Sequence, residues 1–443
     1  MAMATATREG TVEAFLIEGC QPLSGTIRPA GNKNAALPIL AACLLTGEPV
    51  ILENVPHIRD VEEMIELIAA LGVDVEWQGP NTVRVWAAEV NGTKLDPVLC
   101  TRIRASILLA GPLLARFGAA DVPPPGGDVI GRRRVDTHLM AFAALGADVQ
   151  VDREYRLRAP DGLDGAEIHL DEASVTGTEN ALMAAARARG TTVIMNAACE
   201  PHVQDLCHLL CKMGVGIEGI GSNVLVIDGA DALHGCTHRV GPDHIEVASF
   251  IGLAAVTGGD LLIEDAAVEH LRAIRHSFRR LGVEIEIQGT SVRVPPGQEL
   301  VVVDDIHDQV PKIDDGPWPA FPADLTSIAL ALATQARGEI LIFEKMFENR
   351  LFFVDKLVAM GARITLCDPH RAIVNGPSRL HGERVDSPDI RAGMAMLIAA
   401  LAAEGVSEIG RVEQIDRGYE RIDLRLRDLG ARIERVAVEP VPA

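Results

Sequence analysis

A short signal recurs six times along the sequence: a helix-like apolar pattern ends in Leu-Gly or Met-Gly, and an alternating strand pattern follows. The six pairs are Leu71-Gly72, Leu145-Gly146, Met213-Gly214, Leu281-Gly282, Met360-Gly361 and Leu429-Gly430. They lie about 70 residues apart, and self-similarity at a fixed period predicts one supersecondary unit copied along the chain. The fold must therefore assemble copies of that unit, and segments that break the repeat are the first places to look for chemistry.

The fourth copy shows the pattern of one unit most clearly. Apolar residues at three- and four-residue steps over 268–281 predict an amphipathic helix. Gly282 lies where a left-handed C-terminal cap is needed, because glycine adopts positive φ without steric strain. Alternation over 283–288 then predicts a half-buried strand, and 292–294 reads as the returning strand of a hairpin.

The first copy repeats this order and adds a strand in front of it. Asp60 and Glu63 have the spacing of a capping box and predict the start of a helix there. Apolar runs such as 50–52 and 340–343 predict a strand before the helix. Six units of about 70 residues make roughly two domains of three on the usual size of domains. We therefore predict two similar α/β domains with helices inside and sheets outside.

Composition limits the partners of the chain. Its 443 residues carry 62 acidic and 41 basic side chains, a formal charge of -21, and only 3% are aromatic, so nucleic acid is not expected as a partner. No apolar run approaches the roughly 18 residues of a spanning helix, and residues 1–10 lack the apolar core of a secretory signal. Eight cysteines without a disulfide framework favour a reducing compartment. We expect a cytoplasmic protein without a membrane partner.

Two motifs resemble ligand-binding sites, but ordinary structural roles explain them better. Cys199, His202, Cys207, His208 and Cys211 resemble a metal cluster, yet their spacing fits no common structural zinc pattern. Small thiols at apolar helix positions are ordinary core residues. The string Gly-x-Gly-x-x-Gly over 214–219 matches the dinucleotide fingerprint only as letters. That fingerprint requires a strand before it and a helix after it, and here a helix precedes it and a hairpin follows.

Several charged segments are candidate anion sites. Lys33 lies between asparagines at a loop-to-helix junction, where helix N–H groups and an ammonium would bind an anion together; a solvated lysine is the alternative. The loop 123–128 is rich in Pro and Gly and leads into three arginines at 132–134, which reads as a functional lid or as a solvated charge run. In the last third, Asp324, Arg350 and the segments 389–391 and 416–420 read as site residues or as salt-bridged helix caps.

Seven motifs in the same order resemble the UDP-N-acetylglucosamine 1-carboxyvinyltransferase family of enolpyruvyl transferases. They are GNKNAALPIL, RIRASILLAGPLLARFG, PPGGDVIGRRRVDTH, SVTGTEN, PWPAFPADL, MFENRLF and QIDRGYERID. The resemblance implies two inside-out α/β barrel domains, each of three repeated units. It places the first domain at 33–241, with a mobile catalytic loop around 123–134, and the second at 1–32 plus 242–443.

The resemblance also implies an activity. The enolpyruvyl group of phosphoenolpyruvate would move to the 3′-hydroxyl of UDP-N-acetylglucosamine with release of phosphate, the first committed step of peptidoglycan precursor synthesis. The reaction would pass through a tetrahedral ketal while the domains close over both small-molecule substrates. Neither a metal nor a bound prosthetic group is expected.

The same resemblance assigns roles residue by residue. Lys33, Arg133 and Arg417 would bind the phosphate and carboxylate of phosphoenolpyruvate, which suits guanidinium groups because they pair bidentately with oxyanions. Asp324 would be the general base at the 3′-hydroxyl. The expected catalytic set is Lys33, Asp128, Asp324, Asp389 and Arg417. Ser174, Val175 and Thr176, with Arg133, Arg134, Val135, Asp136 and Thr137, would surround the uridine diphosphate. The remaining substrate contacts are expected from Asn34, Arg104, Met346, Arg350 and Arg391.

Asp128 departs from the family pattern, which usually has cysteine at this loop position. An aspartate replaces the thiol as a proton donor only when part of it is protonated; burial beside phosphate would raise its pKa and Arg133 would lower it. We predict an active enzyme that fosfomycin, which alkylates the family's cysteine, does not inactivate. The alternatives are a 5-enolpyruvylshikimate-3-phosphate synthase, a paralogue in specialised metabolism, and a catalytically silent relative that only binds the nucleotide sugar.

Overall fold

The computed structural model describes residues 12–127, 130–131 and 133–438. Contacts divide the chain into two compact units, each with its own hydrophobic core. Unit 1 comprises the described residues up to Pro29, then His244–Gly316, and the described residues from Ala320 onward. Unit 2 comprises Ala30–Asp243 and Pro317–Pro319.

The described strands of unit 1 form three four-stranded sheets, ordered β21-β22-β1-β23, β15-β16-β14-β2 and β17-β18-β20-β19. In each sheet the first strand of a repeat pairs in parallel with the next. A hairpin completes two of the sheets with antiparallel pairs, and in the third the antiparallel strands are β1 and β23, from distant parts of the sequence. The strands are β1 (Val12–Glu18), β2 (Gly25–Ile27), β14 (Leu261–Ile263), β15 (Glu286–Gln288), β16 (Ser291–Val294), β17 (Lys312–Asp314), β18 (Gly338–Phe343), β19 (Ile364–Asp368), β20 (Arg371–Gly376), β21 (Arg384–Asp386), β22 (Val406–Gly410) and β23 (Arg432–Val438).

Unit 2 has the same plan in its described residues, with sheets ordered β13-β3-β5-β4, β11-β12-β10-β9 and β6-β8-β7. Its third sheet has three strands because the segment before β6 forms an isolated bridge, Lys94 to Asp121, instead of a full strand. The strands are β3 (Val50–Glu53), β4 (Asp74–Gly79), β5 (Thr82–Trp86), β6 (Ala119–Val122), β7 (Asp148–Val151), β8 (Tyr155–Arg158), β9 (Glu167–His169), β10 (Thr191–Met195), β11 (Gly216–Glu218), β12 (Val224–Asp228) and β13 (Thr237–Arg239).

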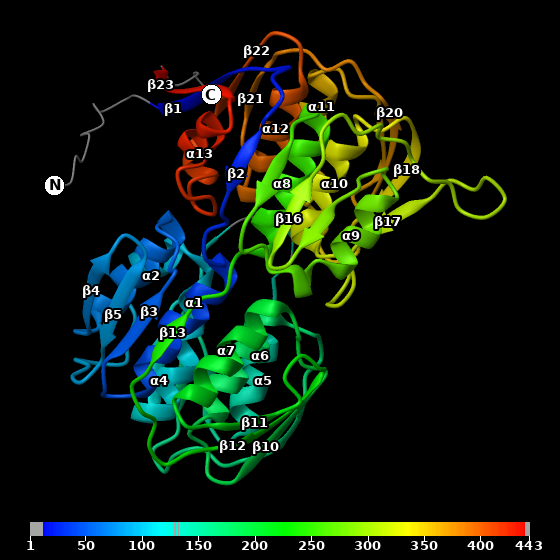
Figure 1. Cartoon of the computed structure of the whole chain (residues 1–443). Helices are drawn as coiled ribbons and strands as arrows, with labels where there is room; N and C mark the ends of the chain where they lie inside the picture. Colours follow the sequence, from blue (N-terminus) through cyan, green and yellow to red (C-terminus); the bar gives the residue numbers. More distant parts are fainter. Residues whose placement is uncertain (1–11, 128–129, 132, 439–443) are drawn as a thin grey trace. The chain divides into compact units, whose positions relative to one another are not determined.

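The first helix of each repeat lies in the interior of its unit. In unit 1, α8 (His244–Thr257), α10 (Thr326–Ala333) and α12 (Ile390–Ala402) pack against one another, as Figure 1 shows. In unit 2 the corresponding helices are α1 (Lys33–Ala42), α4 (Ala110–Phe117) and α6 (Val175–Ala185). Nearly all their residues are buried, and a helix that is apolar on every side is stable only inside a core.

The second helix of each repeat is amphipathic and leads into the hairpin. The glycine that follows each one has positive φ, for example 88° at Gly72 and 79° at Gly282, so the six Leu-Gly and Met-Gly signals are helix ends as predicted. These helices are α2 (Arg59–Ala70), α5 (Asp136–Ala144), α7 (Pro201–Lys212), α9 (Arg272–Arg279), α11 (Val354–Ala359) and α13 (Ile422–Asp428). The remaining helical segments are α3 (Pro97–Arg102) and the 3-10 turns η1 (Cys43–Leu45), η2 (Arg104–Leu109), η3 (Val268–His270), η4 (Ala323–Leu325) and η5 (Val412–Gln414).

The prediction of helices inside and sheets outside is confirmed, but two local predictions need correction. Ile58 is the N-cap of α2 and offers no side-chain cap, so the predicted capping box of Asp60 and Glu63 is wrong. The Asp60 side chain pairs with a lysine instead. The strand expected over 283–288 is paired only at Glu286–Gln288. The N–H and carbonyl groups of Glu284 are bonded to the side chain of Gln298 instead of to a neighbouring strand.

Strands from distant parts of the sequence complete both units. In unit 1, β1 lies between β22 and β23, and β2 pairs in parallel with β14. In unit 2, β13 pairs in parallel with β3, almost 190 residues earlier. Each unit therefore needs both ends of its sequence to close its sheets.

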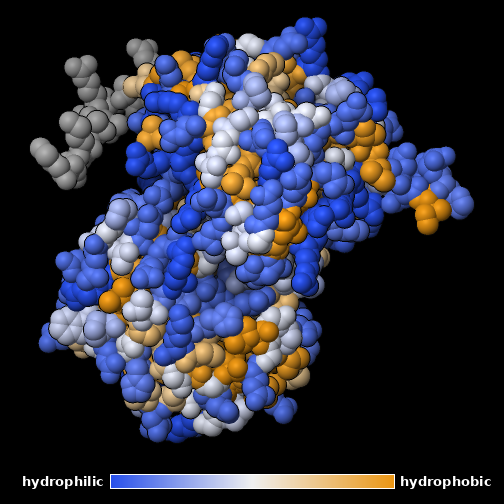
Figure 2. Space-filling model, in the orientation of Figure 1, coloured by the Kyte–Doolittle hydropathy of each residue, from blue (hydrophilic) through white to orange (hydrophobic). Residues whose placement is uncertain are grey.

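The visible surface is mostly hydrophilic, with apolar residues in small separate groups (Figure 2). This distribution fits the formal charge of -21 and the concentration of apolar side chains in the two cores. Within the described residues, no helix combines the length and the hydropathy needed to cross a bilayer.

Candidate functional site

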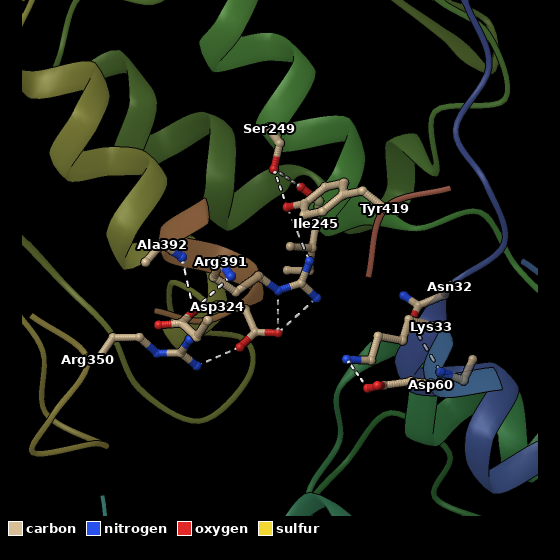
Figure 3. A network of polar contacts seen from close by, with 12 residues as sticks. Asn32, Lys33, Asp60, Ile245, Ser249, Asp324, Arg350, Arg391, Ala392 and Tyr419 are labelled. Carbon is tan, nitrogen blue, oxygen red and sulfur yellow. Dashed lines mark hydrogen bonds and ion pairs between the residues drawn. The ribbon is translucent and has the colours of Figure 1, made fainter. Parts of the chain in front are cut away.

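In unit 2, Lys33 is the first residue of the buried helix α1. The Oδ1 atom of Asn32 accepts a hydrogen bond from the Ala35 N–H at 3.1 Å and so caps the helix at this point. Lys33 is 8% exposed, and its Nζ lies 2.7 Å from Oδ2 of Asp60, which is 2% exposed. Figure 3 shows this pair beside the cap. An ammonium group has three N–H donors, so a lysine anchored by one carboxylate keeps donors for an anionic ligand.

Arg104 holds the backbone that carries the predicted arginines. Its Nη2 donates to the carbonyl oxygens of Arg133 and Arg134, at 2.6 and 3.3 Å. Burial lowers the pKa of Arg104, although an arginine remains charged. Arg134 donates to Asp136 at 3.0 Å and to Asp171 at 2.8 Å, and these contacts raise its pKa. Its charge is therefore already balanced within the chain.

Helix α6 begins beside this arginine segment. Ser174 is its N-cap, and the Ser174 Oγ accepts from the Gly177 N–H at 3.2 Å. Val175 and Thr176 form the first turn, where helix N–H groups and the helix dipole favour an anion. Thr137 donates to Oδ1 of Asp171 at 2.7 Å, so α5 and the start of α6 are linked through the loop between them. The predicted nucleotide-binding residues of unit 2 therefore lie around the N-termini of two helices.

In unit 1, a second group of charged side chains surrounds Asp324. Arg350 Nη2 lies 2.7 Å from Oδ1, while Arg391 Nε and Nη2 both lie 3.1 Å from Oδ2 (Figure 3). The two arginines are each 5% exposed and the aspartate is 28% exposed, so the carboxylate faces outward from a cationic base. Arg350 Nε has no acceptor among the described residues.

Arg391 is held by a chain of hydroxyl groups. Its Nη1 donates to Tyr419 Oη at 3.2 Å, and Tyr419 Oη lies 3.1 Å from Ser249 Oγ. Ser249 donates to the Ile245 carbonyl at 2.8 Å, so the Tyr419 proton points to Ser249 and its oxygen accepts from Arg391. Asp389 is the N-cap of α12: its Oδ1 accepts from the N–H groups of Arg391 and of Ala392. The predicted site residue Asp389 thus orients the backbone of Arg391.

A buried pair of acidic residues supports the loop that carries Met346. Glu344 is fully buried, and its Oε1 accepts from the N–H groups of Met346 and Phe347 at 3.1 and 3.0 Å. Burial, then the hydrogen bond and charge of Asp315, raise the pKa of Glu344 to about 8, while Arg350 opposes this. Glu344 Oε2 and Asp315 Oδ2 have no donor among the described side chains. A proton shared between these two oxygens would satisfy both.

The structure places each predicted site residue that it describes within one of the two units. Arg417 donates to Gln414 at 3.2 Å, beside Tyr419, and Met346 is 37% exposed. Asp128 lies outside the described residues. Unit 2 holds Lys33, Asn34, Arg104, Arg133, Arg134, Val135, Asp136, Thr137, Ser174, Val175 and Thr176; unit 1 holds Asp324, Met346, Arg350, Asp389, Arg391 and Arg417.

Sequence reasoning missed the partners that hold these residues. Asp60 and Tyr419 each lie in a different element from the residue they support, so no local spacing indicates them. Glu344 lies two residues before Met346, but nothing in the sequence around it shows that its side chain is buried. The one available signal is the type of residue: a charged or hydroxyl side chain at an apolar position of a buried segment needs a polar partner.

Comparison with known proteins identifies the fold. A family model described as EPSP synthase (3-phosphoshikimate 1-carboxyvinyltransferase) matches residues 17–426. The enolpyruvyl transferase NikO from Streptomyces tendae is similar with a TM-score of 0.85 and 26% identity, over 97% of this chain and all of that one. An EPSP synthase from Acinetobacter baumannii gives a TM-score of 0.74 at 16% identity, a likeness of fold alone. The chain has the enolpyruvyl transferase fold of two inside-out α/β barrel domains, as predicted.

Sequence relatives define the family more narrowly. The UDP-N-acetylglucosamine 1-carboxyvinyltransferase of Bradyrhizobium diazoefficiens is 59% identical over 95% of this chain and 98% of its own. Proteins of the same name from Treponema denticola and Bacteroides thetaiotaomicron are 55% and 50% identical over at least 95% of this chain. The chain belongs to the UDP-N-acetylglucosamine 1-carboxyvinyltransferase family. These similarities do not favour the two alternative enzymes, a 5-enolpyruvylshikimate-3-phosphate synthase and a paralogue in specialised metabolism.

Proposed function

We propose that the chain transfers the enolpyruvyl group of phosphoenolpyruvate to the 3′-hydroxyl of UDP-N-acetylglucosamine, with release of phosphate, in peptidoglycan precursor synthesis. Support comes from full-length relatives of that name at up to 59% identity. The eight cysteines are free thiols, which fits a reducing, cytoplasmic location for the reaction. The observation on the chain itself that carries the proposal is an outward-facing carboxylate, Asp324, fixed by two buried arginines.

Binding of phosphoenolpyruvate would use the cationic residues of both units. Lys33, Arg133 and Arg417 supply an ammonium and two guanidinium groups for one phosphate and one carboxylate. Lys33 is buried, so its charge is poorly screened by water and acts more strongly on an anion than an exposed lysine would. Asp60 neutralises this buried ammonium before the substrate arrives.

Asp324 would accept the proton of the 3′-hydroxyl as the sugar oxygen attacks C2 of phosphoenolpyruvate. A new C–O bond forms at C2, the double bond supplies its electron pair to C3, and C3 takes up a proton, which gives the tetrahedral ketal. In the second step C3 loses a proton, the double bond re-forms and the C2–O bond to phosphate breaks. Arg350 and Arg391 fix the orientation of the carboxylate, so its contribution is mainly positioned proton transfer.

Asp128 is our proposed proton donor to C3. The position follows from the loop motif of the sequence and lies outside the described residues. A carboxylic acid in this role must carry its proton when the ligand binds, and a neighbouring phosphate dianion favours that state. The proposal therefore replaces the thiol acid of most relatives with an oxygen acid that has a different dependence on pH.

The direct test is phosphate release from phosphoenolpyruvate that depends on UDP-N-acetylglucosamine. We expect Asp324→Asn to lower kcat by about 100-fold or more, as general-base catalysis is typically worth that much, while UDP-N-acetylglucosamine still binds. Asp368→Asn is the matched control because it removes a carboxylate that pairs with the exposed Arg371. No sugar-dependent phosphate release from the natural protein would refute the proposed reaction, and near-normal kcat in Asp324→Asn would remove Asp324 as the base.

A further inference from the structure

A buried chain of hydrogen bonds in unit 2 ends at the hydroxyl of Thr176. It starts at the Gly111 N–H, which donates to Asn180 Oδ1 at 2.9 Å. Asn180 Nδ2 donates to the Ile107 carbonyl at 2.9 Å and lies 2.8 Å from His138 Nδ1. His138 Nε2 lies 3.2 Å from Thr176 Oγ1. Asn180 and His138 are fully buried. The chain thus connects α4, α5 and α6 and reaches the first turn of α6.

The first bond of this chain fixes the direction of all the others. A backbone N–H only donates, so the Asn180 atom facing Gly111 must be the amide oxygen. The amide nitrogen therefore faces His138 and donates to Nδ1. With Nδ1 acting as an acceptor, a neutral imidazole carries its proton on Nε2 and donates it to Thr176. The Thr176 oxygen then accepts, and its own proton is left to point away from His138.

Two further observations agree with a neutral imidazole. Burial, with a contribution from the Arg104 charge, lowers the pKa of His138 to about 3. Among the described residues, His138 is the hydrogen-bond partner of the Thr176 hydroxyl, and Thr176 is only partly buried. The network therefore presents a hydroxyl donor at a helix N-terminus, where the N–H groups and the dipole already favour an acceptor ligand.

We propose that His138 and Asn180 are positioning residues that fix the Thr176 hydroxyl as a hydrogen-bond donor to the diphosphate of the nucleotide-sugar substrate. This inference rests on the proposed function, because the resemblance to the UDP-N-acetylglucosamine 1-carboxyvinyltransferase family implies that Ser174, Val175 and Thr176 surround the uridine diphosphate of that substrate. His138 and Asn180 do not touch the substrate. They fix the direction of the Thr176 hydroxyl proton, which points away from His138. A hydroxyl held in this direction favours a ligand with a charged acceptor over a ligand with a donor.

The test compares affinities for the two substrates. We expect Thr176→Val and His138→Phe to weaken UDP-N-acetylglucosamine binding by about 10- to 100-fold, the worth of a hydrogen bond to a charged group, with the KM for phosphoenolpyruvate nearly unchanged. The double variant should bind no more weakly than Thr176→Val, because both changes remove the same donor. His208→Phe, an exposed histidine on α7, is the control and should leave both constants unchanged.

Nitrogen-15 chemical shifts of the imidazole test the proton directions independently of activity. We expect His138 to carry its proton on Nε2. In Asn180→Asp, where a carboxylate accepts from the ring, the proton should move to Nδ1 and nucleotide-sugar affinity should fall as in Thr176→Val. An Nδ1–H ring in the natural protein, additive effects in the double variant, or equal losses for both substrates would overturn the inference.

The outcomes separate this inference from the proposed function. If the natural protein releases no phosphate, the proposed reaction fails, while calorimetric binding of UDP-N-acetylglucosamine and the ring shifts still judge the role of His138. If the natural protein is active but Thr176→Val binds the nucleotide sugar normally, only the positioning role fails. Thr176 is partly exposed, so this variant remains informative even where His138→Phe does not fold.

Discussion

Replacing Glu344 by glutamine should change how the stability of unit 1 depends on pH. Glu344 is fully buried beside Asp315, and burial with that neighbour raises its pKa from 4.5 to about 8. The native state therefore holds a proton that the unfolded chain releases at much lower pH. The contribution of Glu344 to the free energy of unfolding is greatest below pH 4.5, falls as the pH rises from 4.5 towards 8, and levels off above that. Glutamine cannot ionise, so its variant should lack this fall.

The size of the effect follows from the same pKa values. The interval between 4.5 and about 8 corresponds to on the order of 5 kcal/mol at about 1.36 kcal/mol per pH unit. Part of this loss is shared with Asp315, because the proton belongs to the pair. Glutamine can also donate its amide N–H to the Asp315 oxygen that has no other donor among the described residues. The advantage of Glu344→Gln should therefore grow from pH 5 to about pH 8 and then level off.

Urea unfolding at a series of pH values, followed by circular dichroism, measures the global effect. Tryptophan fluorescence would report on unit 2, because Trp77, Trp86 and Trp318 all belong to it. A local measure is hydrogen exchange of the Met346 amide, which donates to Glu344, compared between variant and natural protein at equal pH.

Glu286→Gln, on an exposed strand of unit 1, is the control for a lost surface charge. Parallel stability curves for Glu344→Gln and the natural protein between pH 5 and pH 9 would show that the buried pair does not hold the proton. A stability advantage of Glu344→Gln over the natural protein that shrinks as the pH rises across this range, with an unchanged control, would contradict the sign of the predicted effect.

Three more predictions concern the charged groups. Lys33→Met should destabilise the fold by about 3 kcal/mol in chemical unfolding, since it leaves the buried Asp60 charge without its ammonium partner; adding Asp60→Asn should restore stability but not turnover. Tyr419→Phe should lower unfolding stability by about 1–3 kcal/mol and also reduce kcat, because Arg391 loses the acceptor that holds it against Asp324, the proposed base; unchanged kcat would argue against that coupling. Fosfomycin should add no mass to the natural protein in intact-mass spectrometry, whereas Asp128→Cys should gain one adduct, and an adduct on the natural protein would contradict this.

Much of the fold could be predicted because its signals are local. Each Leu-Gly or Met-Gly pair combines a helix end with a residue that tolerates positive φ, and the structure confirms both at Gly72 and at Gly282. Where a local sequence pattern fits two different structures, as at the N-terminus of α2, the prediction was wrong. Asp60 and Glu63 have capping-box spacing, but the buried ammonium of Lys33 competes for the same carboxylate and holds it.

The site could be predicted only as a set of residue types. The lysine at the start of α1 and the arginines near Asp324 are visible as motifs, yet the contacts that hold them join elements far apart in sequence. Tyr419 supports Arg391 from a segment beyond strand β22 of the same repeat, and Asn180 orients His138 across two helices. Such pairings depend on which buried side chains meet after packing, and spacing along the chain does not contain that information.

The long-range strand pairing of β1 has a consequence for biosynthesis. The ribosome makes β1 before every other described strand, whereas its neighbours β22 and β23 are made after all the others. Unit 2 has all its paired strands once β13 has been translated, so it can close while synthesis continues. The nascent protein should thus carry a folded unit 2 and an incomplete unit 1. The edges of β1 should stay unpaired until β22 and β23 have been made.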